Sequence, residues 1–218
     1  MKKLLPIIFI LILSSCSKEV PLEQTVVRGE IVYLVNSKKP FTGTTVTYYE
    51  NGQLSIKTNY KDGKEDGLYE SYYKNGQLEF KGNHKDGKRD GLKESFYDNG
   101  QLKFKGNYKD GKREDGLYEE YHENGHLKNK GNYKNGKLDG LYEWYTDNGQ
   151  LSSKGNYKNG KIVGLVESYS ENGQVISKEN YKNGKLDGLY EFYDKKGQVF
   201  YKNCYRIGEE VDISYCEK

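Results

Sequence analysis

An Asn-Gly dipeptide recurs at almost constant spacing along most of this 218-residue chain. Successive copies stand 24 residues apart, except for one step of 25. They are Asn51-Gly52, Asn75-Gly76, Asn99-Gly100, Asn124-Gly125, Asn148-Gly149 and Asn172-Gly173, and Lys196-Gly197 closes the series. A period of this length is typical of arrays of small units that bury apolar surface only by stacking on their neighbours. We therefore expect function to reside in a long surface, and not in a single catalytic pocket.

A second turn dipeptide keeps the same period between these copies. It stands at Asp62-Gly63, Asp86-Gly87, Asp110-Gly111, Asn135-Gly136, Asn159-Gly160 and Asn183-Gly184. The runs between turns are short, rich in Tyr, Phe and Leu, and lack helical periodicity. Asn-Gly accepts the positive φ angles of a type I′ turn, which is a strong hairpin signal. Each unit is therefore predicted to be a strand, a tight Asn-Gly turn, a second strand and a slightly longer turn, and the array to be all-β.

Alternation within the strands separates two faces. Leu68, Glu70 and Tyr72 recur in every unit, whereas the interleaved positions vary, so a period of two assigns the two sets to opposite faces. On the return strand, Gly82 stands two residues before His84, where the other units have Tyr, and such a glycine leaves room for a ring to lie over the backbone. We expect the recurring face to be the core, a ladder of Leu and Tyr with Gly gaps.

Glu and Lys also recur in register. The Glu row is Glu70, Glu94, Glu119, Glu143, Glu167 and Glu191, and the Lys row is Lys81, Lys105, Lys130, Lys154, Lys178 and Lys202. These rows fit either a binding stripe for a charged polymer or cross-strand pairs worth about 0.2–1 kcal/mol each. Their strict recurrence favours pairing within the scaffold.

The unit Gly67 to Asp90, with its Gly-x-Tyr-x-x-Tyr-Tyr-x-Asn-Gly-Gln-Leu pattern, resembles the variant MORN repeat. Its closest likeness is to the bacterial YwqK-type antitoxin family, and the resemblance extends over about 29–202. It implies an elongated, twisted antiparallel β-meander of about seven 24-residue hairpin repeats. For function it implies little beyond protein or lipid contacts, because fold alone does not fix activity.

The first residues read as a targeting segment. Lys2 and Lys3 precede ten apolar residues, Leu4 to Leu13, which are too few for a membrane-spanning helix but suit a signal peptide. The ending Leu13-Ser14-Ser15-Cys16 resembles a bacterial lipobox, in which the cysteine is lipidated; the alternative is an ordinary secretory signal with a chance cysteine. We expect a signal peptide at 1–15, a linker at 16–28 and the repeat array at 29–218. The resemblance implies a lipoprotein of the bacterial cell envelope, in the outer membrane if the cell has one.

Composition restricts the possible partners. Charged residues make up 31% of the chain, but the formal net charge is only +3 and the signs alternate finely, so no nucleic-acid-binding face is expected. The 22 Tyr and 7 Phe, regularly spaced, supply apolar area that a disordered chain lacks. The chain should therefore fold.

Few residues suggest chemistry. Cys204 and Cys216 lie on the two arms of a predicted hairpin in an atypical C-terminal capping unit from about 188, and an even pair in an exported protein favours a disulfide over a metal or redox pair. The single extra residue in Arg113-Glu114-Asp115 should form a loop bulge. We expect no catalytic residues, no metal site and no cofactor, and hence a protein that is not an enzyme.

The interleaved face carries the candidate binding residues Tyr69, Tyr118, Tyr142, Trp144, Tyr190 and Phe192. Exposed aromatic residues are unusual unless they bind something. We expect a protein partner, with neutralisation of a toxin as one special case implied by the family resemblance. A glycan- or cell-wall-binding role is the alternative, although such modules depend on Trp and this chain has one, Trp144.

Overall fold

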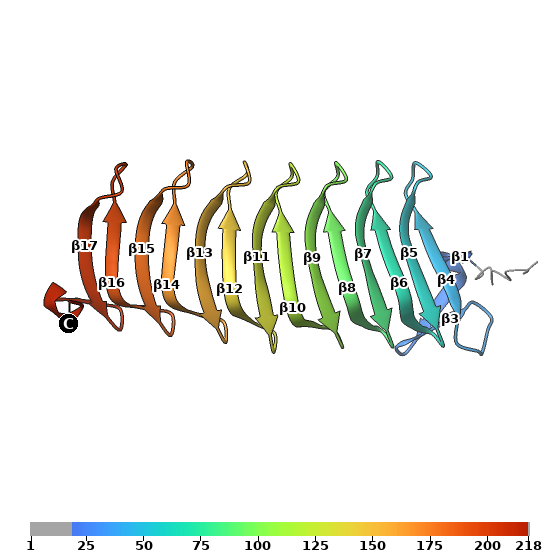
Figure 1. The fold of residues 1–218 in the computed structure, drawn as a ribbon. Helices are drawn as coiled ribbons and strands as arrows, with labels where there is room; N and C mark the ends of the chain where they lie inside the picture. The colour runs from blue at the N-terminus through green and yellow to red at the C-terminus, as the bar shows by residue number, and fades with distance from the viewer. Residues whose placement is uncertain (1–18, 218) are drawn as a thin grey trace, which may run out of the picture.

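The computed structural model describes residues 19–217, which form one open sheet of sixteen strands and a separate two-stranded hairpin. Apart from β1, which pairs with β4 in parallel, the strands of the large sheet follow one another in chain order as antiparallel neighbours. Figure 1 shows the successive hairpins standing side by side from the N-terminal to the C-terminal end. The predicted all-β, elongated meander is confirmed.

The strands fall into a short N-terminal group and a long regular series. The first group is β1 (Glu19–Pro21), the 3-10 helix η1 (Leu22–Gln24), β2 (Thr25–Arg28) and β3 (Ile31–Leu34). The series is β4 (Gly43–Tyr48), β5 (Leu54–Lys61), β6 (Lys64–Tyr72), β7 (Leu78–Lys85), β8 (Lys88–Phe96), β9 (Leu102–Lys109), β10 (Lys112–Tyr121), β11 (Leu127–Lys134), β12 (Lys137–Tyr145), β13 (Leu151–Lys158), β14 (Lys161–Tyr169), β15 (Val175–Lys182), β16 (Lys185–Tyr193) and β17 (Val199–Arg206). β18 (Glu209–Val211) and the 3-10 helix η2 (Ile213–Tyr215) end it.

The expected linker at 16–28 is folded in its described part, 19–28. β1 extends the sheet beside β4, where the Glu19 carboxylate pairs with the Lys57 ammonium at 2.6 Å. The β2–β3 hairpin is tied to the first tight turn, because Val32 N donates to Gly63 O at 2.9 Å and Gly63 N donates to Phe41 O at 2.7 Å. This segment therefore closes the N-terminal edge of the sheet. The predicted signal peptide and Cys16 lie outside the described residues.

The two kinds of turn are the reverse of the prediction. Asp62 and Gly63 both have positive φ, 50° and 79°, and join β5 to β6 directly, as a type I′ turn requires. At the Asn-Gly loops only the glycine has positive φ, and five residues separate the strands, from Tyr49 to Gln53 in the first loop. The Asn side chain explains the longer loop. Asn51 Oδ1 accepts a hydrogen bond from Gln53 N at 3.1 Å, which stabilises the five-residue loop.

Over the first two-thirds of the array, side chains of each longer loop are also bonded to the backbone of the next repeat, and we call these bonds loop stitching. Asn51 Nδ2 donates to Lys74 O at 3.0 Å in the next loop, and Tyr49 Oη donates to Tyr72 O at 2.6 Å. Tyr73, Tyr97 and His122 stand at equivalent positions and bond to the carbonyl of the last residue of β8, β10 and β12, respectively. From Thr146 onward, this position bonds within its own loop instead. Loop stitching thus ends about two-thirds of the way along the array.

The extra residue near Arg113 lies inside a strand and not in a loop. Arg113 pairs with Tyr108 and Tyr118 pairs with Gly106, so the surplus is absorbed by an irregularity between these two pairs. β10 is accordingly ten residues long, against nine in β8 and β12. Bulges commonly accommodate one extra residue in this way without loss of the flanking pairing.

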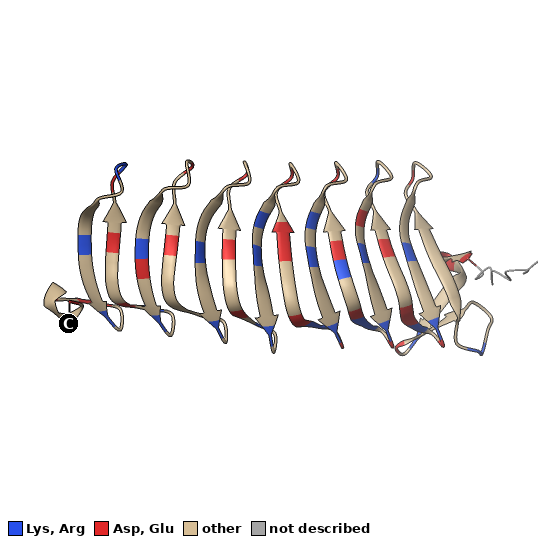
Figure 2. Cartoon of the chain, in the orientation of Figure 1, with Lys and Arg blue, Asp and Glu red and all other residues tan. Residues whose placement is uncertain are grey.

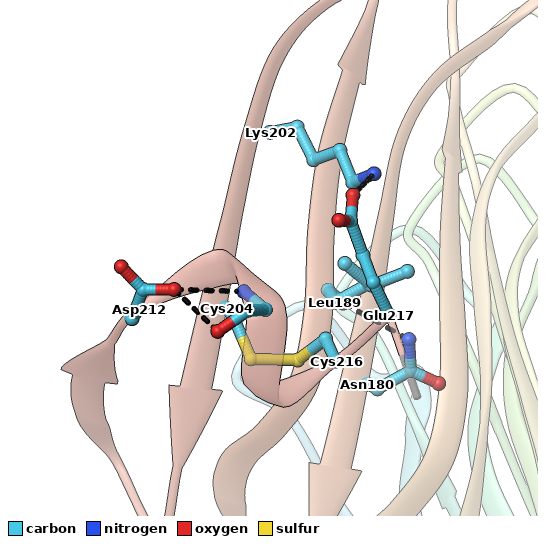
Figure 3. The surroundings of a disulfide bond; sticks show 8 residues. Asn180, Leu189, Lys202, Cys204, Asp212, Cys216 and Glu217 are labelled. Atoms are coloured by element: carbon cyan, nitrogen blue, oxygen red, sulfur yellow. Dashed lines mark hydrogen bonds and ion pairs between the residues drawn. A yellow bond between two sulfur atoms is a disulfide. The ribbon is translucent and has the colours of Figure 1, made fainter.

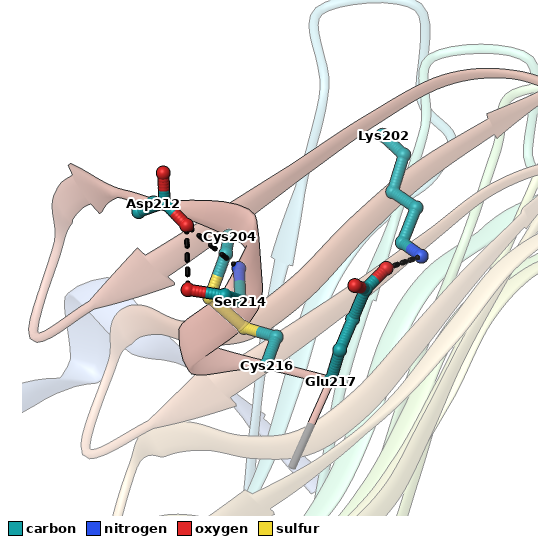
Figure 4. Close-up of polar contacts among 6 residues, drawn as sticks. All are labelled: Lys202, Cys204, Asp212, Ser214, Cys216 and Glu217. Atoms are coloured by element: carbon teal, nitrogen blue, oxygen red, sulfur yellow. Dashed lines mark hydrogen bonds and ion pairs between the residues drawn. A yellow bond between two sulfur atoms is a disulfide. The ribbon is translucent and has the colours of Figure 1, made fainter.

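The C-terminal edge carries the predicted cap. Cys204 on β17 is fully buried and joined by a disulfide to Cys216, with 6.0 Å between their Cα atoms (Figure 3). Asp212 Oδ1 accepts hydrogen bonds from Ser214 N at 3.0 Å and Ser214 Oγ at 2.6 Å, so it begins η2 (Figure 4). The disulfide therefore fixes η2 against the last long strand.

The exposed fractions of the side chains show that the core was expected on the wrong face of the sheet. The Leu68 row, expected inside, is mostly exposed, and Leu117 is 46% exposed. The Tyr72 row is half-buried. By contrast, Tyr118, Tyr142 and Val166, on the face expected to be open, are at most 9% exposed. Period-two alternation separated the two faces correctly, but the apolar packing lies mainly on the other one.

The strand glycines explain this inversion. Gly82 pairs with Tyr69, and Gly131 pairs with both Tyr118 and Tyr142, so the glycines lie in the interleaved row and not beside the Leu68 row. A Cβ built on Gly131 would stand 2.4 Å from Cδ2 of Tyr142. The Tyr142 ring thus lies over the backbone of Gly131. The sequence predicted a ring over this glycine but did not identify it as Tyr142.

We predict that Gly131→Ala destabilises the protein through this contact. The alanine forces the Tyr142 ring off the backbone, which should lower the free energy of unfolding by about 1–3 kcal/mol. Gly82→Ala is the matched control, because its nearest neighbour is the tip of Phe80 at 3.3 Å and a small ring shift relieves it. Urea unfolding of both variants measures the difference; equal stabilities would contradict this packing.

Candidate binding surface

One face of the sheet carries the Glu and Lys rows, and we call it the ion-pair face. In four successive repeats the Lys of the return strand bonds to the Glu of the next forward strand, as in Lys81–Glu94 at 2.7 Å and Lys130–Glu143 at 2.8 Å. Figure 2 shows the resulting alternation of blue and red bars across the array. Because these pairs join successive repeats, the rows act as scaffold, as their recurrence predicted.

A ring completes each of these pairs. Lys154 Nζ lies 3.0 Å from Glu167 Oε2 and 5.5 Å from the centre of the Tyr169 ring, and Tyr169 Oη donates to the same Glu167 oxygen at 3.0 Å. The hydrogen bond from Lys154 holds the pKa of the Glu167 carboxyl below its usual range. Hydrogen bonds to Tyr169 and Glu167 raise the pKa of Lys154. The charges on this face are therefore largely neutralised within the protein.

The opposite face, which we call the aromatic face, contains the six candidate binding residues. Tyr118 packs edge-on against Phe104, with 5.3 Å between ring centres, and Tyr142 lies 4.4 Å from Trp144. Burial raises the pKa of Tyr142 to about 12. Such tilted and edge-on contacts are the preferred geometries of aromatic pairs. These central rings form the packing of the sheet itself, so Tyr118 and Tyr142 are not exposed as the sequence suggested.

The C-terminal end of the aromatic face is different. Tyr190 and Phe192 are half-buried and pack with Phe200 and Tyr201 on β17, around a hollow of about 390 Å³. Phe200 is 68% exposed, and its ring centre lies 6.2 Å from that of Phe192. The sequence prediction did not include Phe200 and Tyr201. The available signal was Phe200, which stands where the other units place Glu, Lys, Ser or Ile, next to a second aromatic residue. We call Tyr190, Phe192, Phe200 and Tyr201 the terminal aromatic patch.

A groove of about 580 Å³ lies between Ser170–Ile176 and Tyr193–Lys195, where the loop stitching has ended, and its lining mixes polar residues with Val175, Ile176 and Tyr193. Among residues 19–217, no group of three or more His, Cys, Asp and Glu is arranged to hold a metal ion. Nor does this part of the chain contain a helix long and apolar enough to cross a membrane.

The histidines take structural positions. His84 stands in the Tyr row of the aromatic face and packs against Tyr69 with 5.7 Å between ring centres, and burial lowers its pKa. His122 Nε2 lies 3.0 Å from Tyr145 O and His126 Nδ1 lies 2.7 Å from Asp147 O, so both take part in loop stitching. His126 is exposed and His122 is half-buried.

Comparison with protein families identifies the repeat. The model of the MORN repeat variant matches seven stretches, at residues 41–62, 65–86, 89–110, 114–135, 138–159, 162–183 and 186–206. Each stretch contains one long loop and ends at a tight turn. No curated protein matches this chain in sequence.

We predict that Glu167→Gln removes stability that depends on pH. Because the pKa of Glu167 is depressed in the folded protein, its contribution is present above the usual carboxyl pKa and is lost as the pH falls through the folded value. The variant should be less stable than the parent by up to about 1 kcal/mol at neutral pH, since such pairs are partly solvated. The difference should shrink as the pH falls to about 3 in urea titrations. A difference independent of pH would contradict the ion pair.

Proposed function

We propose that this chain, which belongs to the MORN repeat variant family, is a non-catalytic binding protein of the bacterial cell envelope, anchored by acyl chains on Cys16. Its aromatic face binds another protein. The terminal aromatic patch is the observation that carries this proposal, because a cluster of rings is open to solvent at the end of an otherwise packed face. Exposed aromatic clusters of this kind mark interaction sites.

The backbone beside this patch supports a protein ligand. β18 pairs only with Cys204, Tyr205 and Arg206, so among the described strands the outer edge of β17 from Val199 to Asn203 has no partner. An open edge offers N–H and C=O groups to an added strand, and the neighbouring rings offer pockets for its side chains. Glycans cannot use a strand edge in this register, which favours a polypeptide.

The anchor and the patch lie at opposite ends of the array. Cys16 precedes β1 by three residues, so lipid on Cys16 would hold the first strand within about 10 Å of the membrane surface. From β4 to β17 the strands are consecutive neighbours, and at about 4.8 Å each they place the patch roughly 60 Å further along. The sheet thus acts as an arm that presents its binding end away from the anchor. Neutralisation of a toxin, as in the YwqK-type antitoxin family, is one special case of this function.

We predict that Phe192→Ser/Phe200→Ser abolishes capture of the partner from envelope extract. The partner should fall below about a tenth of the wild-type yield, since central aromatic residues dominate interface energies. The matched control is Leu165→Ser, which removes an exposed apolar side chain from the ion-pair face. Quantitative mass spectrometry of the eluates measures the loss, and thermal melts check that all variants fold. Unchanged capture, or sedimentation with glycan that depends on Phe200, would overturn the proposal.

We further predict that Cys16→Ala releases the protein from the membrane fraction. The thiol is the acyl acceptor in the proposed lipoprotein, so the variant should lose metabolic labelling by a fatty-acid analogue. Cys204→Ser/Cys216→Ser is the control, because it removes the other two thiols and should leave labelling intact. A wild-type protein without lipid label would exclude the anchor.

A further inference from the structure

Three basic side chains gather on the aromatic face near the middle of the array. They are Arg89 and Lys93 on β8 and Arg113 on β10, and we call them the cation cluster. Lys93 Nζ lies 5.2 Å from the ring centres of both Phe80 and Phe104. The Arg113 guanidinium lies 4.4 Å from the ring centres of both Tyr118 and Tyr133. The positive charges therefore lie close to aromatic rings, where they are partly removed from water.

Among residues 19–217 the cation cluster forms no direct ion pair with a carboxylate, although Arg113 is near enough to Glu120 to help lower the pKa of that carboxyl. No member takes part in the ion pairs of this region, unlike the lysines of the ion-pair face. The acidic groups on the aromatic face are engaged elsewhere: Glu65 lies 3.5 Å from His84, Ser71 Oγ donates to Glu79 at 3.2 Å, and Glu120 accepts from Tyr118 and Asn129.

The fold does not need these charges. The row of Arg89 and Arg113 continues as Leu138, Ile162 and Leu186, each paired with the Tyr at the same position of the neighbouring strand. The row of Lys93 continues as Tyr118, Tyr142, Val166 and Tyr190. The same scaffold is thus built with apolar residues in the later repeats. The charge on Lys93 opposes folding, as its lowered pKa shows: burial is the main cause, and Arg89 and Arg113 add to it.

A hollow adjoins the cluster. It has a volume of about 390 Å³ and is lined by Glu65, Tyr69, Ser71, Phe80, His84, Arg89 and Lys93. Two cations stand at its wall beside aromatic surface. A carboxylate entering it would meet a guanidinium able to make paired hydrogen bonds and an ammonium in a partly desolvated site, where such contacts are strong.

We propose that the cation cluster binds an acidic segment of the protein partner, with carboxylates on Arg89, Lys93 and Arg113 and apolar side chains on the rings between them. This inference rests on the proposed function and specifies the chemistry of its ligand. A continuous polyanion fits less well, because Glu65, Glu79 and Glu120 flank the cluster on the same face and would repel its further charges. A peptide can place isolated acids at the cations and neutral residues at these glutamates.

The test uses variants that copy this chain's own later repeats. Arg89→Leu, Lys93→Tyr and Arg113→Leu are combined, since Leu138 and Tyr118 show that the scaffold accepts these residues. The charge-matched control is Lys61→Gln/Lys134→Gln/Lys158→Gln, which removes three exposed lysines from strand ends. The probe is a fluorescent peptide of alternating Glu and Phe; the same peptide with Lys for Glu, and a sulfated oligosaccharide, are the comparison ligands. Fluorescence anisotropy gives each dissociation constant.

We expect the Glu-Phe peptide to bind the wild type and the lysine control, and the dissociation constant to rise at least about tenfold in the cluster variant. Binding should also weaken as ionic strength rises from about 0.05 M to about 0.5 M, because the charges become screened. Equal binding of the Lys-Phe peptide, tighter binding of the oligosaccharide, or an unchanged constant in the cluster variant would overturn the proposal.

The two proposals fail in different ways. If the cation cluster is not a ligand site but the aromatic face binds a protein, the cluster variant still captures the envelope partner, whereas Phe192→Ser/Phe200→Ser does not. If the aromatic face binds no protein, neither set of variants changes what is captured. Thermal melts confirm that the cluster variant is folded, and a melting temperature at or above that of the wild type is expected once the like charges are removed.

Discussion

A sheet of a single layer has no second layer to bury its apolar side chains, so this protein must bury them within the face itself. The strand glycines make this possible, because a ring can lie over a backbone that carries no side chain. Tyr118 and Tyr142 each have a glycine on both neighbouring strands, and they are the most buried tyrosines among the described residues. Hydrogen-bonded strands provide the length of the molecule, and the glycine row provides its packing.

The same constraint explains where the surface opens. Tyr190 stands between Glu179 and Asn203, so it has no glycine on either side, and it is only half-buried. Tyr69, between Thr58 and Gly82, has one glycine and is also half-buried. The terminal aromatic patch therefore lies where the glycine row has ended. A side chain in place of the glycine keeps the ring away from the backbone. The aromatic rings of the last repeat are therefore more exposed to solvent than those of the central repeats.

The sequence was sufficient for the period, the strands and the separation of two faces, because turn dipeptides and alternation are local signals. It could not tell which face is packed, since the decisive contact joins Gly131 to Tyr142 on another strand. The sequence also predicted the Asn-Gly turn to be the tight one. In the structure, Asn51 instead forms hydrogen bonds within its own longer loop and to Lys74 in the next one. Residues 19–28 looked like a linker because β1 has three residues and pairs with a strand distant in sequence.

The two faces of the sheet have different roles. On the ion-pair face the recurring charges of the central repeats are paired with those of the neighbouring repeat, so that face contributes cohesion and little specificity. On the aromatic face the repeats differ, with Arg89, Lys93 and Arg113 in the middle and Phe200 at the end. Seven strand spacings separate β10, which carries Arg113, from β17, which carries Phe200. At about 4.8 Å per strand, this distance is roughly 34 Å. An extended segment of about ten residues spans this distance. One polypeptide with acidic residues at one end and apolar residues at the other can therefore occupy both regions at once, and its two contacts would reinforce each other without either being strong alone.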